Sequence, residues 1–79
     1  MHAHGLEPTM SRREILERVL AVEREARELL EEASEVVPDP EERRLFARLA
    51  GREQDAIREL TDAEERLEAE AFVQQALDV

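Results

Sequence analysis

The chain has 79 residues, a net charge of −10, 41% charged residues and no cysteine, which limits it to one small domain. The missing cysteine excludes disulfides, cysteine-based zinc sites and thiol nucleophiles. The acidic balance argues against nucleic acid as a partner, because phosphate binding needs a basic patch. No apolar run approaches the ~20 residues of a membrane span, and no signal-peptide core follows the start. We therefore expect a soluble, cytoplasmic protein.

Residues 1–9 are expected to form a flexible arm, because they contain glycine and proline and show no apolar period. Residues 10–79 are expected to form a single all-α domain. Its first helix should cover residues 11–37, since Ser11 and Glu14 have the spacing of a capping box.

The first helix carries apolar residues at alternating spacings of four and three, the heptad pattern of a helix that packs along one seam. Further leucines and a valine widen this seam to a broad apolar face. We expect the seam to be the packing face of the helix. Its members are Ile15, Val19, Val22, Ala26, Leu29, Ala33 and Val36, widened by Leu16, Leu20, Leu30 and Val37.

A Pro-Asp-Pro sequence predicts a turn at residues 38–39, because proline disfavours helix in the residue before it and aspartate is a good N-cap. So short a turn favours an antiparallel pair of helices. The second helix should cover residues 40–61, followed by a C-terminal helical segment at 62–78. Thr61 and Asp62 each precede a glutamate by three residues, so either a break or one continuous helix is compatible with the sequence.

The second helix repeats the seam, with one carboxylate, Glu53, among its apolar members. In an antiparallel pair centred on this turn, Glu53 lies level with Glu23 or Arg24 of the first helix. Two carboxylates then meet in the seam, and a dimer would have four. The members of the second seam are Phe46, Leu49, Glu53, Ala56, Leu60, Ala63 and Leu67.

Two interpretations of these acids remain open. Glutamates gathered inside a four-helix bundle are how carboxylate-bridged di-iron sites are built, and iron or manganese suits such oxygen ligands. Glu23 and Glu53 are then metal ligands. Alternatively Glu53 has a structural role and forms an ion pair with Arg24 or Arg27, because an isolated buried carboxylate is costly.

Two amphipathic helices are expected to be an incomplete structure. They touch along one line, which leaves part of a broad apolar face uncovered. Chains below roughly 70–80 residues seldom reach a stable core without staples. We expect a homodimer or higher oligomer that forms a four-helix bundle; the alternative is a helix of another protein on the apolar face.

The stretch at 19–60 resembles the ferritin-like, rubrerythrin-type helical hairpin, including the half-bundles of encapsulated ferritin-like proteins. The similarity lies in an acidic first helix, a D-P-E turn, and an L-F-x-x-L-A run that ends at a glutamate. The segments that carry it are AVERE at 21–25, Glu31-Glu32-Ala33, the turn at 38–41 and LFARLAGRE at 45–53. The resemblance implies hairpins that dimerise to complete a bundle and its ferroxidase site.

The family's E-x-x-H motif is only half present. Glu53 stands at its glutamate, but Ala56 stands where the histidine ligand belongs. The glutamate of the first helix corresponds to Ala21 or to Glu23, depending on the loop alignment. The resemblance therefore implies a dimerising structural or interaction module with a degenerate di-iron site. The alternative is an iron-binding protein, of ferroxidase or storage type, with a carboxylate site at the dimer interface.

The two histidines, His2 and His4, both lie in the arm. A pair of histidines can bind zinc or nickel, but the arm offers no rigid support and only Glu7 as a third ligand. The competing interpretation is an ordinary unstructured terminus. No serine or threonine has a histidine base within the helices, so the sequence identifies no catalytic residues.

Overall fold

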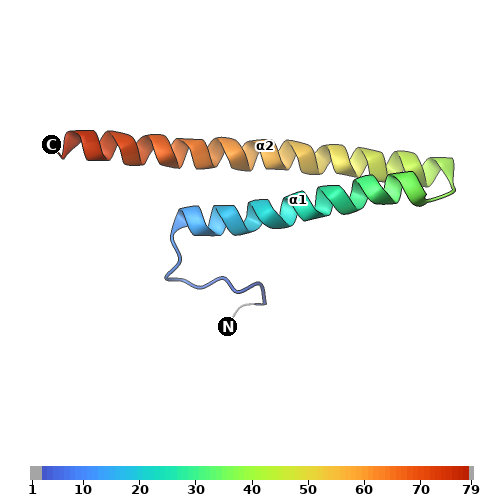
Figure 1. The fold of residues 1–79 in the computed structure, drawn as a ribbon, viewed down its shortest axis with the longest axis horizontal. Helices are drawn as coiled ribbons and strands as arrows, with labels where there is room; N and C mark the ends of the chain where they lie inside the picture. The colour runs from blue at the N-terminus through green and yellow to red at the C-terminus, as the bar shows by residue number, and fades with distance from the viewer. Residues whose placement is uncertain (1–2, 79) are drawn as a thin grey trace.

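A computed structural model describes residues 3–78, and over that range the chain is an antiparallel hairpin of two helices, α1 (Arg12–Val36) and α2 (Pro40–Leu77) (Figure 1). The expected all-α class is confirmed. The molecule measures 60 × 30 × 12 Å, the dimensions of a single layer of two helices side by side. Within residues 3–78, neither helix is long and apolar enough to cross a membrane.

The helix ends are fixed by caps that the sequence predicted. The hydroxyl of Ser11 accepts a hydrogen bond from the backbone N–H of Glu14 at 3.1 Å. The carboxylate of Asp39 accepts one from the N–H of Glu41 at 3.3 Å. Val37 is extended, with φ −70° and ψ 136°, as expected of a residue before proline. These caps satisfy N–H groups that have no partner inside the helix.

The second helix runs without a break through Thr61 to Leu77, so the continuous helix is the alternative that the structure adopts. The hydroxyl of Thr61 donates a hydrogen bond to the carbonyl of Ile57 at 2.8 Å. This hydrogen bond joins two residues of the same helix. The hydroxyl of Thr61 is therefore satisfied inside α2 and does not cap the start of a new helix.

The face of α1 that packs on α2 is shifted from the predicted seam. Val22, Leu29 and Val36 are 52%, 67% and 69% exposed, so the prediction that they face the second helix is wrong. The hairpin instead buries Leu20 and half-buries Leu16 and Leu30. The other members of the predicted seam are half-buried beside them, namely Ile15, Val19, Ala26 and Ala33. The residues along the packed side are Leu16, Leu20, Glu23, Arg27, Leu30, Ser34 and Val37, all buried or half-buried.

On α2 the predicted seam is confirmed, since every member from Phe46 to Leu67 is half-buried. The buried hydrophobic side chains among the described residues are Leu20 on α1 and Ala50 and Ile57 on α2, each 5–6% exposed. So small a core follows from the two-helix layer, in which each helix has a single neighbour.

The hairpin exposes more surface than a compact protein of its size. Its accessible area is 6400 Å², against about 4,900 Å² for a folded monomer of this mass. Its radius of gyration is 17.2 Å, against about 12 Å for a compact domain of this length. A large apolar area therefore remains uncovered in the single chain.

Replacement of Gly51 by alanine should stabilise the fold. Gly51 lies inside α2, is exposed, and an added Cβ would meet nothing within 4 Å. Alanine is favoured over glycine in a helix interior by about 1 kcal/mol. We expect Gly51→Ala to raise the free energy of unfolding by about that amount in urea titrations followed by far-UV circular dichroism. Ala47→Gly, at another exposed position of α2, should lower it similarly. A loss of stability in Gly51→Ala would show that this side of α2 is covered.

Candidate functional site: a carboxylate pair between the helices

The structure brings Glu23 of α1 and Glu53 of α2 together in the interhelical seam. Both side chains are half-buried, and they are close enough for the protonated carboxyl of Glu23 to donate a hydrogen bond to Glu53. Their positions follow from the turn, which sets the two residues at a similar distance along antiparallel helices. Two like-charged groups are thus held side by side at the middle of the hairpin.

The pair changes the acidity of Glu23. The hydrogen bond to Glu53 raises the pKa of Glu23 above its ordinary value, and partial burial and the charge of Glu53 act in the same direction. Each cause disfavours the ionised form. The carboxyl group of Glu23 therefore holds a proton more readily than a separate surface glutamate does.

Part of the pair lacks a partner. The Oε2 atom of Glu53 is shielded from solvent and accepts no hydrogen bond from the described residues. The predicted ion pair to Arg27 is not formed, because Arg27 donates to the amide oxygen of Gln54 at 2.6 Å and lies 3.7 Å from the carboxylate of Glu31. Nor does Arg24 form an ion pair with Glu53 in the part of the chain that the structure describes. The arginines nearby leave the carboxylate pair without a counter-charge.

The donor set of one hairpin does not fit a di-iron centre. No group of three or more His, Cys, Asp or Glu side chains within residues 3–78 could hold a metal ion. Ala56, where the ferritin-like pattern would place a histidine, has no ligand atom, and neither has Ala21, one of the two positions, with Glu23, that could match the glutamate of the first helix. One chain therefore offers two carboxylates, Glu23 and Glu53, and further ligands would have to come from another chain.

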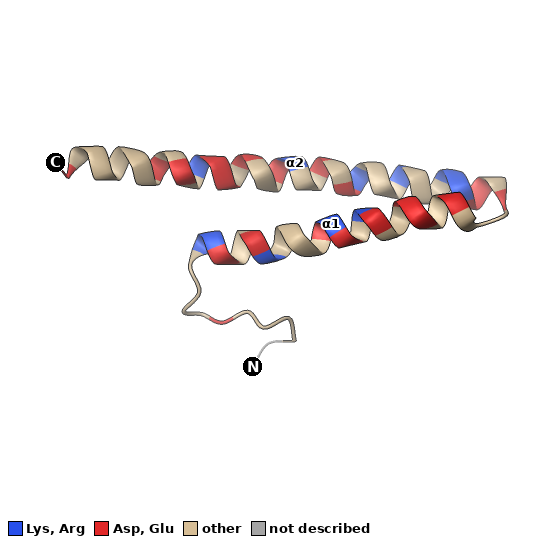
Figure 2. Ribbon diagram, viewed as in Figure 1, with Lys and Arg blue, Asp and Glu red and all other residues tan. Residues whose placement is uncertain are grey.

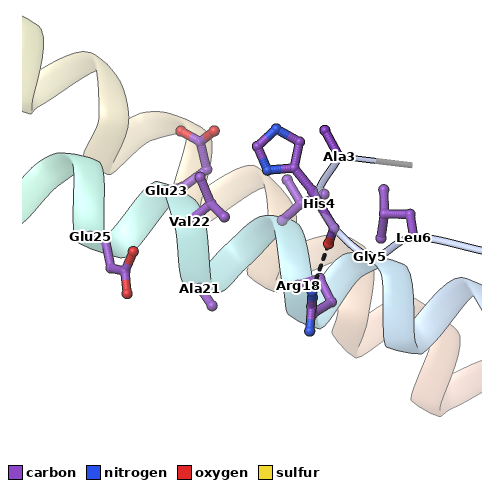
Figure 3. A pocket seen from close by; sticks show the side chains of 10 residues that line it. Ala3, His4, Gly5, Leu6, Arg18, Ala21, Val22, Glu23 and Glu25 are labelled. Atoms are coloured by element: carbon purple, nitrogen blue, oxygen red, sulfur yellow. Dashed lines mark hydrogen bonds between the residues drawn. The ribbon is translucent and has the colours of Figure 1, made fainter. Parts of the chain in front are cut away.

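The N-terminal arm lies beside α1 and forms an open groove of about 780 Å³ with it (Figure 3). Arg18 donates a hydrogen bond to the carbonyl of His4 at 2.6 Å. His4 and Glu23 line the same groove, but they belong to no three-ligand cluster among the described residues. His2 lies outside the described residues. The groove thus contains one histidine of the predicted pair and no complete metal site.

The chain matches no protein-family model, no curated protein and no solved structure. A two-helix hairpin occurs in many unrelated folds, so the architecture alone does not identify a family.

Replacing Glu53 by glutamine should stabilise the hairpin at neutral pH. The amide removes the repulsion and can donate a hydrogen bond to Glu23, a contribution of about 1 kcal/mol. A carboxyl whose folded pKa lies above its unfolded value lowers stability as pH rises through that interval. The advantage of Glu53→Gln should therefore be largest at pH 7 and should shrink below pH 4.5, the ordinary value for a glutamate.

Urea unfolding at both pH values measures this difference. Glu65→Gln, at an exposed position of the same helix, removes the same charge outside the pair and serves as the matched control. Equal effects of Glu53→Gln at the two pH values would contradict the account of the pair.

Proposed function

We propose that this protein is a small dimerising helical module, in which a second copy of the hairpin completes a four-helix bundle. The observation that carries the proposal is the line of exposed valine and leucine side chains at Val22, Leu29 and Val36, each seven residues from the last. A heptad line of this kind is the mark of a helix that packs on another helix. The resemblance of 19–60 to ferritin-like hairpins, which complete their bundles by dimerising, supports the same function.

The uncovered area is large enough for a stable interface. The hairpin exposes about 1,500 Å² more than a compact monomer of its mass, whereas a standard interface buries about 800 Å² on each partner. Apolar surface contributes roughly 25 cal/mol for each Å² removed from water. A partner that covered half of the excess would therefore gain substantial stability.

Val22 and Leu29 of α1 and Leu45 of α2, which is 39% exposed, lie on one side of the layer. Each is about 130° from the middle of the side of its helix that packs on the other helix. In an antiparallel pair these two flanks point the same way. A second copy has the same one-sided surface, so two hairpins can stack face to face about a two-fold axis.

A charge placed in this surface should separate the dimer without unfolding the hairpin. We expect Leu29→Glu to convert the dimer to a monomer at micromolar concentration, measured by size-exclusion chromatography with light scattering. Ala47→Glu introduces the same charge at an exposed position of α2 outside the apolar surface, and it should remain dimeric. A dimeric Leu29→Glu protein would place the interface elsewhere.

The carboxylate pair supports a second candidate, the binding of a divalent cation such as Fe²⁺ or Mn²⁺ between two hairpins. The solvent-shielded Oε2 of Glu53 has no hydrogen-bond donor, and Glu23 and Glu53 together bear two like charges at one point of the seam. A cation would neutralise this repulsion, and oxygen ligands suit these metals. In this candidate each copy contributes Glu23 and Glu53 to one four-carboxylate site.

The two candidates differ in their response to metal. If the pair binds a cation, Fe²⁺ under anaerobic conditions or Mn²⁺ should raise the melting temperature of the wild-type protein, since a ligand of the folded state stabilises it by mass action. The double variant Glu23→Gln/Glu53→Gln should lose that response while it remains folded. An unchanged melting temperature of the wild type at millimolar Mn²⁺ and Fe²⁺ would refute the metal candidate and leave the dimerising module intact.

A further inference from the structure

The C-terminal end of α2 extends past α1 (Figure 1). Arg12, the first residue of α1, lies 3.7 Å from the carboxylate of Glu70, and Arg13 donates to Glu68 at 2.8 Å. Residues 71–77 therefore continue for about 10 Å beyond the last contact between the helices. We call this segment the overhang.

The overhang is apolar and exposed. Phe72, Val73 and Leu77 are 72%, 55% and 76% exposed. At the opposite end of the hairpin, next to the turn, Val36 and Leu45 are exposed as well. Each end of one molecule thus presents apolar surface that the hairpin itself leaves uncovered.

Charge is distributed unevenly along α2 (Figure 2). Between residues 43 and 52 the helix has four arginines and no acid, whereas between 62 and 70 it has five acids and one arginine. Two α2 helices side by side in the same direction would place like charges together. In opposite directions, the basic stretch of one lies along the acidic stretch of the other, which is the favourable arrangement.

One stripe of α2 specifies how two such helices would be aligned. It runs along the border of the side that packs on α1, where Leu49, Ala56 and Ala63 are half-buried, on the same flank as the exposed Leu45, and it alternates spacings of four and three throughout. The stripe is symmetric about Thr61: Leu45 and Leu77 are equally far from it in sequence, and so are Leu49 and Val73. Its members are Leu45, Leu49, Arg52, Ala56, Glu59, Ala63, Arg66, Glu70, Val73 and Leu77.

We propose that in the dimer the two α2 helices pack antiparallel about a two-fold axis beside Thr61, so that the overhang of each copy covers the turn end of the other. Leu77 of one copy then meets Leu45 of its partner, and Val73 meets Leu49. Arg52 of one copy meets Glu70 of the other, once on each side of the axis. This inference rests on the proposed dimer and adds its orientation and register: at the level of Leu29, the partner contributes the overhang of its α2.

This register also bears on the carboxylate pairs. Glu53 lies eight positions from Thr61 in sequence, so the two copies of Glu53 would be about 24 Å apart along the axis at 1.5 Å per residue. That separation is too large for a shared cation. The proposed register therefore excludes one four-carboxylate site and favours the structural role of the module.

Cysteine cross-linking tests the register directly, because the native chain contains no cysteine. In the double variant Leu45→Cys/Leu77→Cys, the two sites on one helix are about 48 Å apart, so they cannot form a disulfide within a chain. We expect mild oxidation to give a covalent dimer with most of the chains linked. Each single variant should remain unlinked, because identical positions lie far apart in the antiparallel arrangement. Leu45→Cys/Ala76→Cys, rotated by about 100° on the same helix, should link at least tenfold more slowly.

The possible outcomes distinguish a wrong register from the absence of a dimer. A covalent dimer of the Leu45→Cys variant alone would mean that the turn ends lie together, and it would overturn the antiparallel register. Failure of the double variant to link, while the wild type sediments as a dimer, would also overturn it. A wild type that sediments as a monomer would instead refute the proposed function.

A charge swap provides a second readout of the same contact. We expect Arg52→Glu and Glu70→Arg each to weaken the dimer by about tenfold in Kd, since two symmetric ion pairs are lost. The double variant Arg52→Glu/Glu70→Arg should restore the wild-type Kd within about threefold. Additive losses in the double variant would show that the two side chains do not meet.

Discussion

The structure depends on the fact that two helices can contact each other along a single line. That line buries Leu20, Ala50 and Ile57 and leaves the remaining apolar residues of both helices half-buried or exposed. The deficit is geometric, because no rotation of two helices can cover a face wider than their common seam. A second layer of helices would cover the apolar surface that the single layer leaves exposed. For this reason we propose that the exposed flank binds a second copy of the hairpin.

The seam itself is not optimised for the hairpin alone. Glu23 and Glu53 occupy its middle and share a hydrogen bond that raises the pKa of Glu23, while the Oε2 atom of Glu53 lacks a donor. An apolar pair at these positions would bury more surface without electrostatic cost. The two acids therefore call for an explanation besides packing, and the proposed register favours a structural role in the complete assembly over a shared cation.

The sequence specified the helices, their caps and the turn, because each depends on local chemistry: Ser11 and Asp39 cap, and proline stops the first helix. It also predicted that Glu23 and Glu53 lie at one level, since the turn alone determines that register.

The sequence did not predict the rotation of α1, that is, which side of this helix packs on α2. A continuous line of apolar residues indicates that a helix packs, but not against which neighbour. Here Leu16, Leu20 and Leu30 lie on the side that packs on α2, while Val22 and Leu29 stay exposed. The sequence also left open whether α2 continues through Thr61. A threonine that precedes acids can cap a new helix, or its hydroxyl can donate a hydrogen bond to a carbonyl of the preceding turn, as Thr61 does to Ile57.

Sedimentation equilibrium of the unmodified chain at micromolar concentration tests directly whether two hairpins form a dimer. One chain has a mass of 9.1 kDa. We expect a single species of twice that mass, about 18 kDa, and a helical circular dichroism spectrum at every concentration at which this dimer is present. A folded, helical monomer of 9.1 kDa over the same range would contradict this expectation. In that case the two-helix layer would be stable with its apolar flank in water, and that flank would no longer require a second copy.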